Sequence, residues 1–333
     1  MADAPSIVDE ADPLDASPAA CRTRPDHDRV LLVRPTYFDV TYEINPYMGG
    51  DVDRDRARTQ WRALRDAYDR YVDVAVLDPA ETWATIESEP TPAPPSDVDA
   101  APSSSAEAAP SSVADPAPPA ERPDMVFAAN LGLPTADGTG LVLASMATDE
   151  RRGEPAHLAA WARAAGYETV EPPIAAFEGT GDAFWHPGRR LLWGGYGVRT
   201  EREAYDDLAD RLDTPVLALE LTDDRYYHLD VCLTPLDGTT ALIQPEAFTE
   251  DGLARIREVF ESVLEIPIDE SREGMAGNAH CVDGDHVLLP ADNPATESIL
   301  TEAGYEPVPI ETSEFEKAGG SVFCLSLELG RSA

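Results

Sequence analysis

Apolar runs and amphipathic stretches alternate along most of the chain. The apolar residues that begin at Val30 predict a first strand. Within residues 53–71, Trp61 and Leu64 stand at helical spacing, which predicts a helix with one apolar face. The run VDVAVL at residues 72–77 predicts the next strand.

The same succession of helix and strand recurs later in the sequence. Five helical patterns are each followed by a short β-like run, and they begin near Asp53, Glu154, Thr200, Thr249 and Pro294. Their spacing is about 50 residues once a Pro-rich stretch is set aside, which is typical of a propeller or array of similar units. Strands that alternate with helices indicate an α/β architecture. We therefore expect one α/β domain over residues 29–331.

Two stretches lack the large apolar residues that packing requires. Residues 1–28 are acidic and rich in Ala, Pro and Asp, and we expect them to form a disordered tail. Residues 87–122 are rich in Pro, Ala, Ser and acids, and they fit a disordered insertion within the domain or a linker between two domains. The repeat pattern favours the insertion, because the first unit lies on both sides of it.

The charge is strongly unbalanced, with 63 acidic and 25 basic residues and a net charge of −38. Such a field repels nucleic acid and anionic lipid, so neither is expected as a partner. We interpret the charge as an adaptation to a salt-rich cytoplasm, where screening acts within about 3 Å at molar salt. The sequence shows neither a signal peptide nor an apolar segment long enough to span a membrane, so a cytoplasmic location is expected.

The four cysteines are widely separated, which favours neither a disulfide framework nor a zinc site. No cofactor and no metal are expected. The oligomeric state, monomer or homo-oligomer, stays open.

The stretch YYHLDVCLTPL at residues 226–236 predicts a strand that places His228, Asp230 and Cys232 on one face. A histidine beside a carboxylate suits proton transfer at neutral pH. The alternative is a structural histidine that a neighbouring acid satisfies.

Cys324 follows Gly319 and Gly320 near the start of the last predicted strand, a setting that suits a nucleophile. A buried structural cysteine is the alternative, and Cys232 and Cys281 are the competing thiols.

Further polar candidates lie in three segments. Glu178 and Asp182 stand in a Gly-rich turn, where a ligand could approach the backbone or solvent could surround the acids. Arg199 precedes a helix and suits either a substrate carboxylate or a surface ion pair. Asn130 lies in a predicted apolar strand, MVFAANLGL, where a buried amide needs a hydrogen bond to backbone or ligand.

Taken in order, the EGxGD turn at Glu178, HLD at His228 and GGxxxCLSL at Cys324 resemble the guanidino-group-modifying enzymes of the pentein superfamily. That superfamily includes arginine deiminases, dimethylargininases and amidinotransferases. The resemblance covers residues 30–329 and implies a five-bladed α/β propeller. It also implies that the partner is a small guanidino substrate, arginine or a methylated arginine.

The resemblance implies a role for each main residue. The Cys324 thiolate attacks the central guanidinium carbon, and His228 protonates the departing amine and then deprotonates water. Glu178 orients His228, and Asp230 pairs with the guanidinium. The remaining candidates for substrate binding are Asn130, Asp182, Arg199, Arg151 and, within a lid, Asn45.

One departure affects the expected substrate. Arginine deiminases carry an aspartate where this sequence has Asn130, and an amide cannot balance a guanidinium charge. The ANxG pattern at Asn130 resembles the branch that contains dimethylargininase-type proteins and arginine dihydrolases. We expect the commoner assignment, which is hydrolysis of dimethylarginine to citrulline and dimethylamine through a covalent thiouronium intermediate. The alternative is an arginine dihydrolase that yields ornithine, CO2 and ammonia, followed by an arginine deiminase or amidinotransferase. A ribosome-binding factor of the same fold is the non-enzymatic alternative.

Overall fold

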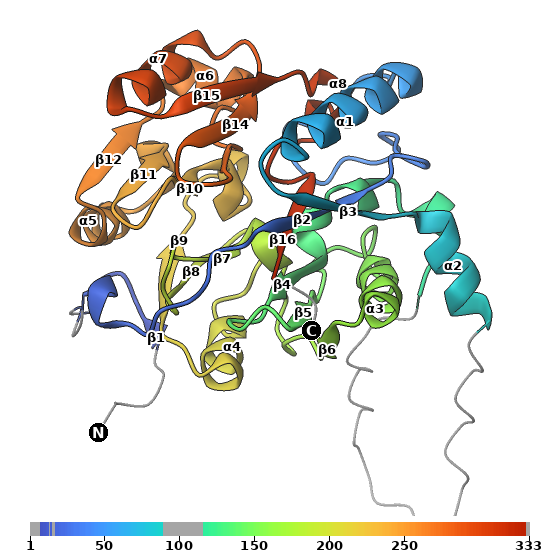
Figure 1. Ribbon diagram of the computed structural model, residues 1–333, viewed down its shortest axis with the longest axis horizontal. Coiled ribbons are helices and arrows are strands. Elements are labelled where there is room, and N and C mark those ends of the chain that lie inside the picture. The colour runs from blue at the N-terminus through green and yellow to red at the C-terminus, as the bar shows by residue number, and fades with distance from the viewer. Residues whose placement is uncertain (1–6, 13, 15–16, 89–115, 331–333) are drawn as a thin grey trace, which may run out of the picture.

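The computed structural model describes residues 7–12, 14, 17–88 and 116–330, and within them the strands form five small sheets (Figure 1). The helices are α1 (Arg54–Tyr68), α2 (Pro79–Ser88), α3 (Glu154–Ala165), α4 (Ala204–Leu212), α5 (Glu250–Val259), α6 (Ile268–Glu273), α7 (Pro294–Ala303) and α8 (Ser313–Glu316). The strands of the N-terminal half are β1 (Ile7–Val8), β2 (Arg29–Val33), β3 (Asp73–Leu77), β4 (Gly132–Pro134), β5 (Gly140–Leu143), β6 (Glu168–Val170), β7 (Ala183–Trp185) and β8 (Leu192–Tyr196). Those of the C-terminal half are β9 (Val216–Glu220), β10 (Leu233–Pro235), β11 (Thr240–Ile243), β12 (Ser262–Glu265), β13 (His280–Cys281), β14 (His286–Pro290), β15 (Glu306–Ile310) and β16 (Ser326–Leu329).

All five sheets share one topology. In the sheet β4-β5-β6, the first two strands are antiparallel, while β5 and β6 are parallel and are joined through α3. The crossover helices of the other sheets are α1, α4, α5 and α7, and Figure 1 shows the five at the periphery. Parallel neighbours require such a crossover, which explains the regular alternation in the sequence.

The last strand closes the series of sheets. Strand β16 pairs antiparallel with β2, with Ser326 opposite Leu32, so the C-terminal strand completes the N-terminal unit. The five predicted helix-and-strand units are thereby confirmed, as is the α/β fold class with five blades.

Helix α1 shows why these units form where they do. The Asp53 carboxylate caps its first turn, because its Oδ1 accepts hydrogen bonds from the backbone N–H groups of Asp55 (3.1 Å) and Arg56 (3.0 Å). The predicted apolar face, with Trp61 and Leu64, is buried. The helix ends at residue 68, three residues before the predicted end.

The expectation of a disordered tail is wrong for the part of it that the structure describes. Strand β1 adds to the sheet of β7, β8 and β9 by parallel pairing with β9. The Arg202 guanidinium donates two hydrogen bonds to Asp9, of 2.7 and 2.9 Å, and Glu10 accepts one from the backbone N–H of Glu220 (2.6 Å). Main-chain pairing and ion pairs hold this segment, so a composition poor in apolar residues does not reveal it.

Most of the predicted insertion, residues 89–115, lies outside the described residues. Its two flanks meet on α3, where His157 Nδ1 is 2.8 Å from Thr82 Oγ1 and His157 Nε2 is 3.0 Å from the Ala117 carbonyl oxygen. The limits of the domain and of the insertion stay a prediction.

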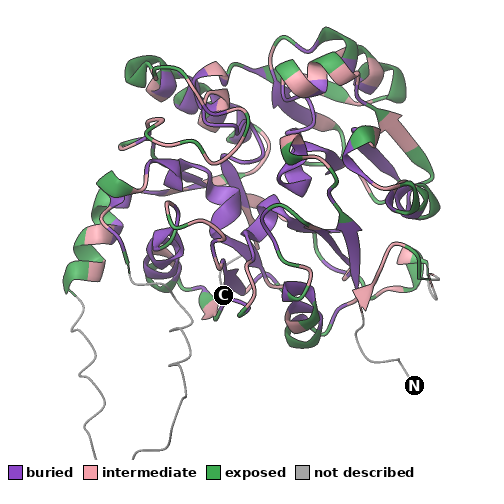
Figure 2. Cartoon of the chain, turned by 180° about the vertical axis from the view of Figure 1, so that it is seen from behind, coloured by how far each residue is buried: buried purple, intermediate pink, exposed green. Residues whose placement is uncertain are grey.

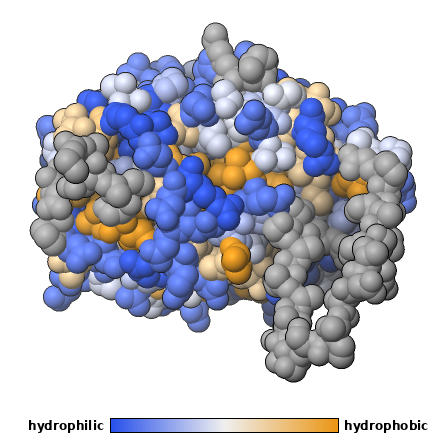
Figure 3. All heavy atoms as spheres, turned by 90° about the horizontal axis from the view of Figure 1, so that it is seen from below, coloured by the Kyte–Doolittle hydropathy of each residue, from blue (hydrophilic) through white to orange (hydrophobic). Residues whose placement is uncertain are grey.

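Burial follows the strands, which Figure 2 shows mostly in the colour of buried residues, while helix surfaces are largely exposed. Hydrophilic residues cover much of the face seen in Figure 3. Among the described large apolar side chains, Ile174 is the most exposed at 92%. None of the described helices is long and apolar enough to cross a membrane.

Candidate active site

The segments that lie just before the first strand of each sheet converge at the centre of the molecule. They precede β4, β7, β10, β13 and β16. These segments carry Asn130, Glu178 with Asp182, His228 with Asp230, Asn278, and Cys324. Hydrogen bonds join members of different segments, so the repeated topology brings five distant parts of the sequence into one site.

Cys324 and Asp230 form the core of this site. The Cys324 Sγ lies 3.0 Å from Asp230 Oδ2, and both residues are buried. Burial, together with the neighbouring Asp230 carboxylate, raises the pKa of the Cys324 thiol well above its usual value. Burial likewise raises the pKa of Asp230 to about 7. At rest the thiol therefore keeps its proton and donates a hydrogen bond to Asp230.

Asn278, which the sequence analysis missed, fixes the nucleophile from the other side. Its Nδ2 donates to Cys324 Sγ (3.1 Å) and to the Asp230 carbonyl oxygen (3.1 Å). Its Oδ1 accepts from the backbone N–H groups of Ser321 (3.1 Å) and Cys324 (3.2 Å). One buried amide thus shapes the turn that carries the thiol and also contacts the sulfur.

The predicted strand through His228 and Asp230 is wrong. His228 has an extended backbone, but Leu229–Val231 forms a 3-10 turn and β10 begins only at Leu233. The reason is a tertiary contact: Asp182 Oδ1 accepts a hydrogen bond from the Leu229 backbone N–H (3.1 Å) and stabilises the turn. His228 and Asp230 still reach the same site.

His228 and Glu178 form a buried pair. His228 Nε2 lies 2.7 Å from Glu178 Oε2. Burial opposes ionisation of Glu178, yet the His228 hydrogen bond and the Arg199 charge hold its pKa well below the usual range. An ionised Glu178 accepts the proton on Nε2, which leaves Nδ1 as the basic atom of the imidazole.

Asp182 lies behind this pair. Its Oδ2 accepts a hydrogen bond from Thr200 Oγ1 (2.7 Å), and burial raises its pKa to about 6. Gly181 is required beside it, because a Cβ there would overlap the amide nitrogen of Asn130. The glycine-rich turn is therefore packed and buried, and the solvated alternative does not hold.

Arg199 lies in the site, but its guanidinium already has partners. It donates to Glu178 Oε2 (3.1 Å) and to the Ile44 carbonyl oxygen (2.8 Å). Its Cζ lies 5.2 Å from the centre of the Tyr227 ring, within cation–π range. The surface-pair alternative is excluded, since Arg199 is buried and lines the cavity at this site.

Arg151 orients Asn130. Its Nη1 donates to Asn130 Oδ1 (2.7 Å), and its Nη2 pairs with Glu154 Oε2 (2.8 Å). The Asn130 amide nitrogen therefore turns towards His228 Nδ1, 3.5 Å away. Asn130 lies in a 3-10 turn (Ala128–Leu131) rather than in the predicted strand, because this segment wraps over the glycine-rich turn.

Asn45 lies against the turn that precedes Cys324. Its Nδ2 donates to the Ala318 carbonyl oxygen (3.1 Å), and it packs against Gly319, whose φ of 89° favours glycine. The cavity at this site has a volume of only about 10 Å³. Its lining includes Ile44, Asn45, Asp124, Phe127, Asn130, Arg151, Arg199, Tyr227, His228, Ala318, Gly320 and Cys324.

Cys324 alone among the four free cysteines lines this cavity. Cys232 is buried, and its thiol donates to the Leu229 carbonyl oxygen (3.4 Å). Cys281 lines a different cavity, and burial raises its pKa to about 12. Within the described residues, no group of three or more His, Cys, Asp or Glu is placed to hold a metal ion.

Sequence reasoning missed Asn278, Asp124 and Tyr227. Asn278 is separated by 46 residues from the sulfur that it contacts. Asp124 is fully buried at the cavity, and burial raises its pKa to about 6. The one sequence signal was a polar residue inside an otherwise apolar segment, as in PDMVF and GNAHCV.

Comparison with known proteins agrees with this geometry. The family model described as N,N dimethylarginine dimethylhydrolase, eukaryotic, matches residues 113–331. The bifunctional arginine dihydrolase/ornithine cyclodeaminase ArgZ of Synechocystis sp. is 32% identical over 91% of this chain, which spans 38% of that relative. The N(G),N(G)-dimethylarginine dimethylaminohydrolase of Mycobacterium tuberculosis is 32% identical over 94% of this chain and 89% of its own length.

Solved structures show the same relationship. The substrate-bound N-terminal domain of ArgZ superposes with a TM-score of 0.74 at 30% identity, covering 91% of this chain and 98% of that one. A dimethylarginine dimethylaminohydrolase with a bound S-methyl-L-thiocitrulline adduct shares the fold, with a TM-score of 0.65 at 20% identity, covering 91% of this chain and 100% of that one.

Fold and site together place the chain in the pentein superfamily. Within that class, the chain belongs to the family of dimethylarginine hydrolases that the model at residues 113–331 represents.

Replacing Asn278 should slow the reaction. In Asn278→Ala the thiolate loses a charge-assisted hydrogen bond of about 1.5–3 kcal/mol, so we expect kcat to fall about 10- to 100-fold. The pH at which Cys324 reaches half its maximal alkylation rate should rise. Stopped-flow kinetics and alkylation with iodoacetamide across pH measure both effects.

Asn278→Asp is the matched control. Its carboxylate keeps an acceptor for the Ser321 and Cys324 N–H groups but places negative charge beside the sulfur. If Asn278 only held the turn, this variant would alkylate and turn over like the unaltered protein, which would contradict its role at the sulfur.

Proposed function

We propose that this protein hydrolyses the guanidinium of an arginine-type substrate through a covalent adduct on Cys324. The observation that carries the proposal is the carboxylate of Asp230. Its Oδ2 contacts the nucleophile, while its buried Oδ1 has no well-formed hydrogen bond within the described chain. A buried carboxylate with free acceptor capacity calls for a cationic donor, and a guanidinium supplies two parallel N–H groups.

The substrate itself would activate the nucleophile. At rest, burial disfavours both the Cys324 thiolate and the Asp230 carboxylate. A guanidinium placed between them favours both charged forms, so the thiol proton can pass to His228, which lines the same cavity, as the cation binds. The reactive thiolate then exists mainly in the complex.

His228 would move the protons. The thiolate attacks the central guanidinium carbon, and His228 protonates the departing nitrogen, which leaves as ammonia or dimethylamine. The imidazole, held by Glu178 through Nε2, then accepts a proton from the water that attacks the Cys324-bound carbon. Breaking the carbon–sulfur bond regenerates Cys324.

Arginine is our first candidate for the substrate. The polar lining formed by Asn130, Arg151 and Asp124 supports an unmethylated guanidinium, whose –NH2 groups can hydrogen-bond to it. The arginine-binding ArgZ domain is also similar across nine-tenths of this chain. One water would convert arginine into citrulline and ammonia. A second attack of Cys324 at the ureido carbon of citrulline, followed by a second water, would give ornithine, CO2 and a second ammonia. Dimethylarginine is the second candidate, which the family model and the full-length M. tuberculosis relative support.

Substrate entry would require the site to open. A cavity of about 10 Å³ holds no amino acid. The segment around Asn45 is the movable wall on which the proposal relies, because it contacts the nucleophile turn and Arg199 through a few hydrogen bonds. Arg199, with N–H groups to spare, is the proposed partner of the substrate carboxylate.

Product analysis tests the substrate. Purified protein in molar salt is incubated separately with L-arginine and with asymmetric dimethylarginine, and products are identified by mass spectrometry. We expect ornithine with ammonia from arginine, and a loss of about 10⁴-fold or more in Cys324→Ser. Citrulline with dimethylamine as the faster reaction would establish the second candidate instead. Unchanged turnover in Cys324→Ser would contradict the mechanism.

The pH dependence of kcat/KM should follow the ionisation of Asp230. A protonated Asp230 cannot pair with a guanidinium, and its pKa in the free protein is raised to about 7 by burial. We therefore expect kcat/KM to fall as the pH drops below about 7, approaching about tenfold per pH unit. In Asp230→Asn the value should be lower and this acid limb should be absent. An identical limb in both proteins would assign the titration to another group.

A further inference from the structure

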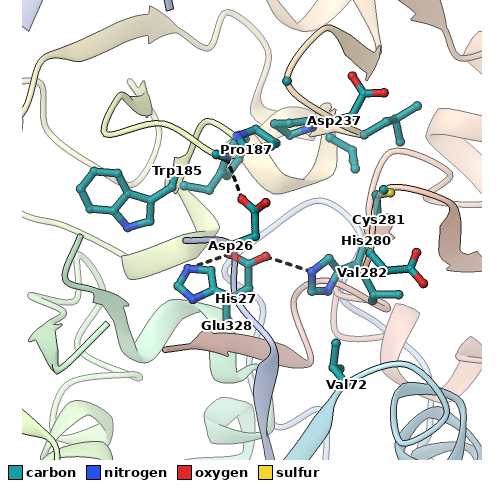
Figure 4. A pocket seen from close by; sticks show the side chains of 18 of the residues that line it. Asp26, His27, Val72, Trp185, Pro187, Asp237, His280, Cys281, Val282 and Glu328 are labelled. Atoms are coloured by element: carbon teal, nitrogen blue, oxygen red, sulfur yellow. Dashed lines mark hydrogen bonds and ion pairs between the residues drawn. The ribbon is translucent and has the colours of Figure 1, made fainter. Parts of the chain in front are cut away.

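A second and larger cavity lies away from the active site. Its volume is about 400 Å³, and its walls are residues 24–28 together with the turns that follow β7, β10 and β13 (Figure 4). Phe323 lines this cavity, while the next residue, Cys324, lines the active site. The two cavities therefore lie on opposite sides of the segment that carries the nucleophile.

The charges around this cavity are unequal. Five carboxylates line it, and they belong to Asp26, Asp28, Asp237, Asp283 and Glu328. Arg24 is the arginine in the lining. Burial lowers the pKa of His27 to about 4, so His27 is neutral at physiological pH. The surplus of negative charge favours a ligand that carries a cation.

The Arg24 guanidinium lies beside Trp185 in the cavity wall. Arg24 is buried, and its Cζ lies 4.9 Å from the centre of the Trp185 ring. Its Nη2 contacts His27 Nε2, while its Nε has no hydrogen-bond partner within the described residues. Burial lowers the pKa of Arg24 to about 10, which still leaves it charged at neutral pH. A buried arginine with spare donors suits a carboxylate from a ligand.

Figure 4 shows Trp185 on one side of the cavity and Asp237 with Cys281 on the other. Burial raises the pKa of Cys281, and the charges of Asp283 and Asp237 raise it further, so both carboxylates act on the side of the cavity where Cys281 lies. Asp26 and Glu328 also line the cavity, and their charges act on Arg24. The end at Asp237 is therefore anionic, while the end at Arg24 carries both signs.

The space between these ends is apolar. Phe184, Leu233, Val282 and Phe323 contribute to its walls. An aliphatic stem buried against such walls is stabilised, because apolar surface is removed from water. A carboxylate, an aliphatic stem and a terminal cation, in that order, describe a free basic amino acid.

We propose that this cavity is a second binding site for a basic amino acid, with its carboxylate at Arg24 and its cationic end at Asp237 and Asp283. The choice of arginine or ornithine as ligand rests on the proposed function, in which they are substrate and product. A bound ligand contacts Phe323 and thereby reaches the residue next to the nucleophile.

Isothermal titration calorimetry of Cys324→Ser, which does not turn over, tests this proposal. Titrations in molar KCl with L-arginine, and separately with L-ornithine, should resolve two sites for at least one of the two. In Cys324→Ser/Asp237→Asn/Asp283→Asn the second site should weaken at least about tenfold, because the cation loses both charged partners. Asparagine keeps an acceptor oxygen for the backbone N–H groups of Thr239 and Asp285, so the turns are retained.

Cys324→Ser/Asp230→Asn is the matched control, because it should weaken the active site and spare the second site. If the titrations resolve a single site, and its affinity depends on Asp237 and Asp283 but not on Asp230, the proposed function is refuted while the second binding site is supported. Val72→Arg, which fills the cavity from its wall, should also abolish the second site and covers the case in which the triple variant does not fold. Binding that neither set of substitutions at this cavity changes, or no binding at all, would overturn the proposal.

Discussion

The antiparallel pairing of β16 with β2 is the constraint on which the site depends. This pairing closes the series of five units. It also places the turn before β16 at the centre of the molecule, beside the turns before β4, β7, β10 and β13. Each unit contributes a short polar segment at the same structural position. The catalytic candidates thus come from parts of the chain as far apart as Asn130 and Cys324, yet hydrogen bonds connect them.

In the proposed mechanism, electrostatics keeps the nucleophile protonated until a substrate binds. Burial opposes both the Cys324 thiolate and the Asp230 carboxylate, so the thiol keeps its proton and donates a hydrogen bond to Asp230. A bound cation reverses this balance, because it compensates both negative charges at once. On this account, discrimination for guanidinium compounds and activation of the nucleophile have the same physical origin.

The sequence predicted the repeated architecture well, because helix and strand periodicities are local and each unit carries both. It also predicted the residues that meet at the site, through the motifs at Glu178, His228 and Cys324. It failed where tertiary contacts decide the backbone. The HLD segment forms a turn because Asp182 binds the Leu229 N–H, and Asn278 matters because of a sulfur distant in sequence. The ordered part of the N-terminal tail is held by strand pairing and by Arg202, neither of which composition reveals.

Peptide mapping after inactivation with 2-chloroacetamidine, a guanidinium-like alkylating reagent, tests the central claim most directly. The account predicts that loss of activity parallels modification of Cys324, that an arginine-type substrate protects it, and that Cys324→Ser is not labelled at the site. Inactivation that tracks modification of Cys232 or Cys281 while Cys324 stays free would contradict the account.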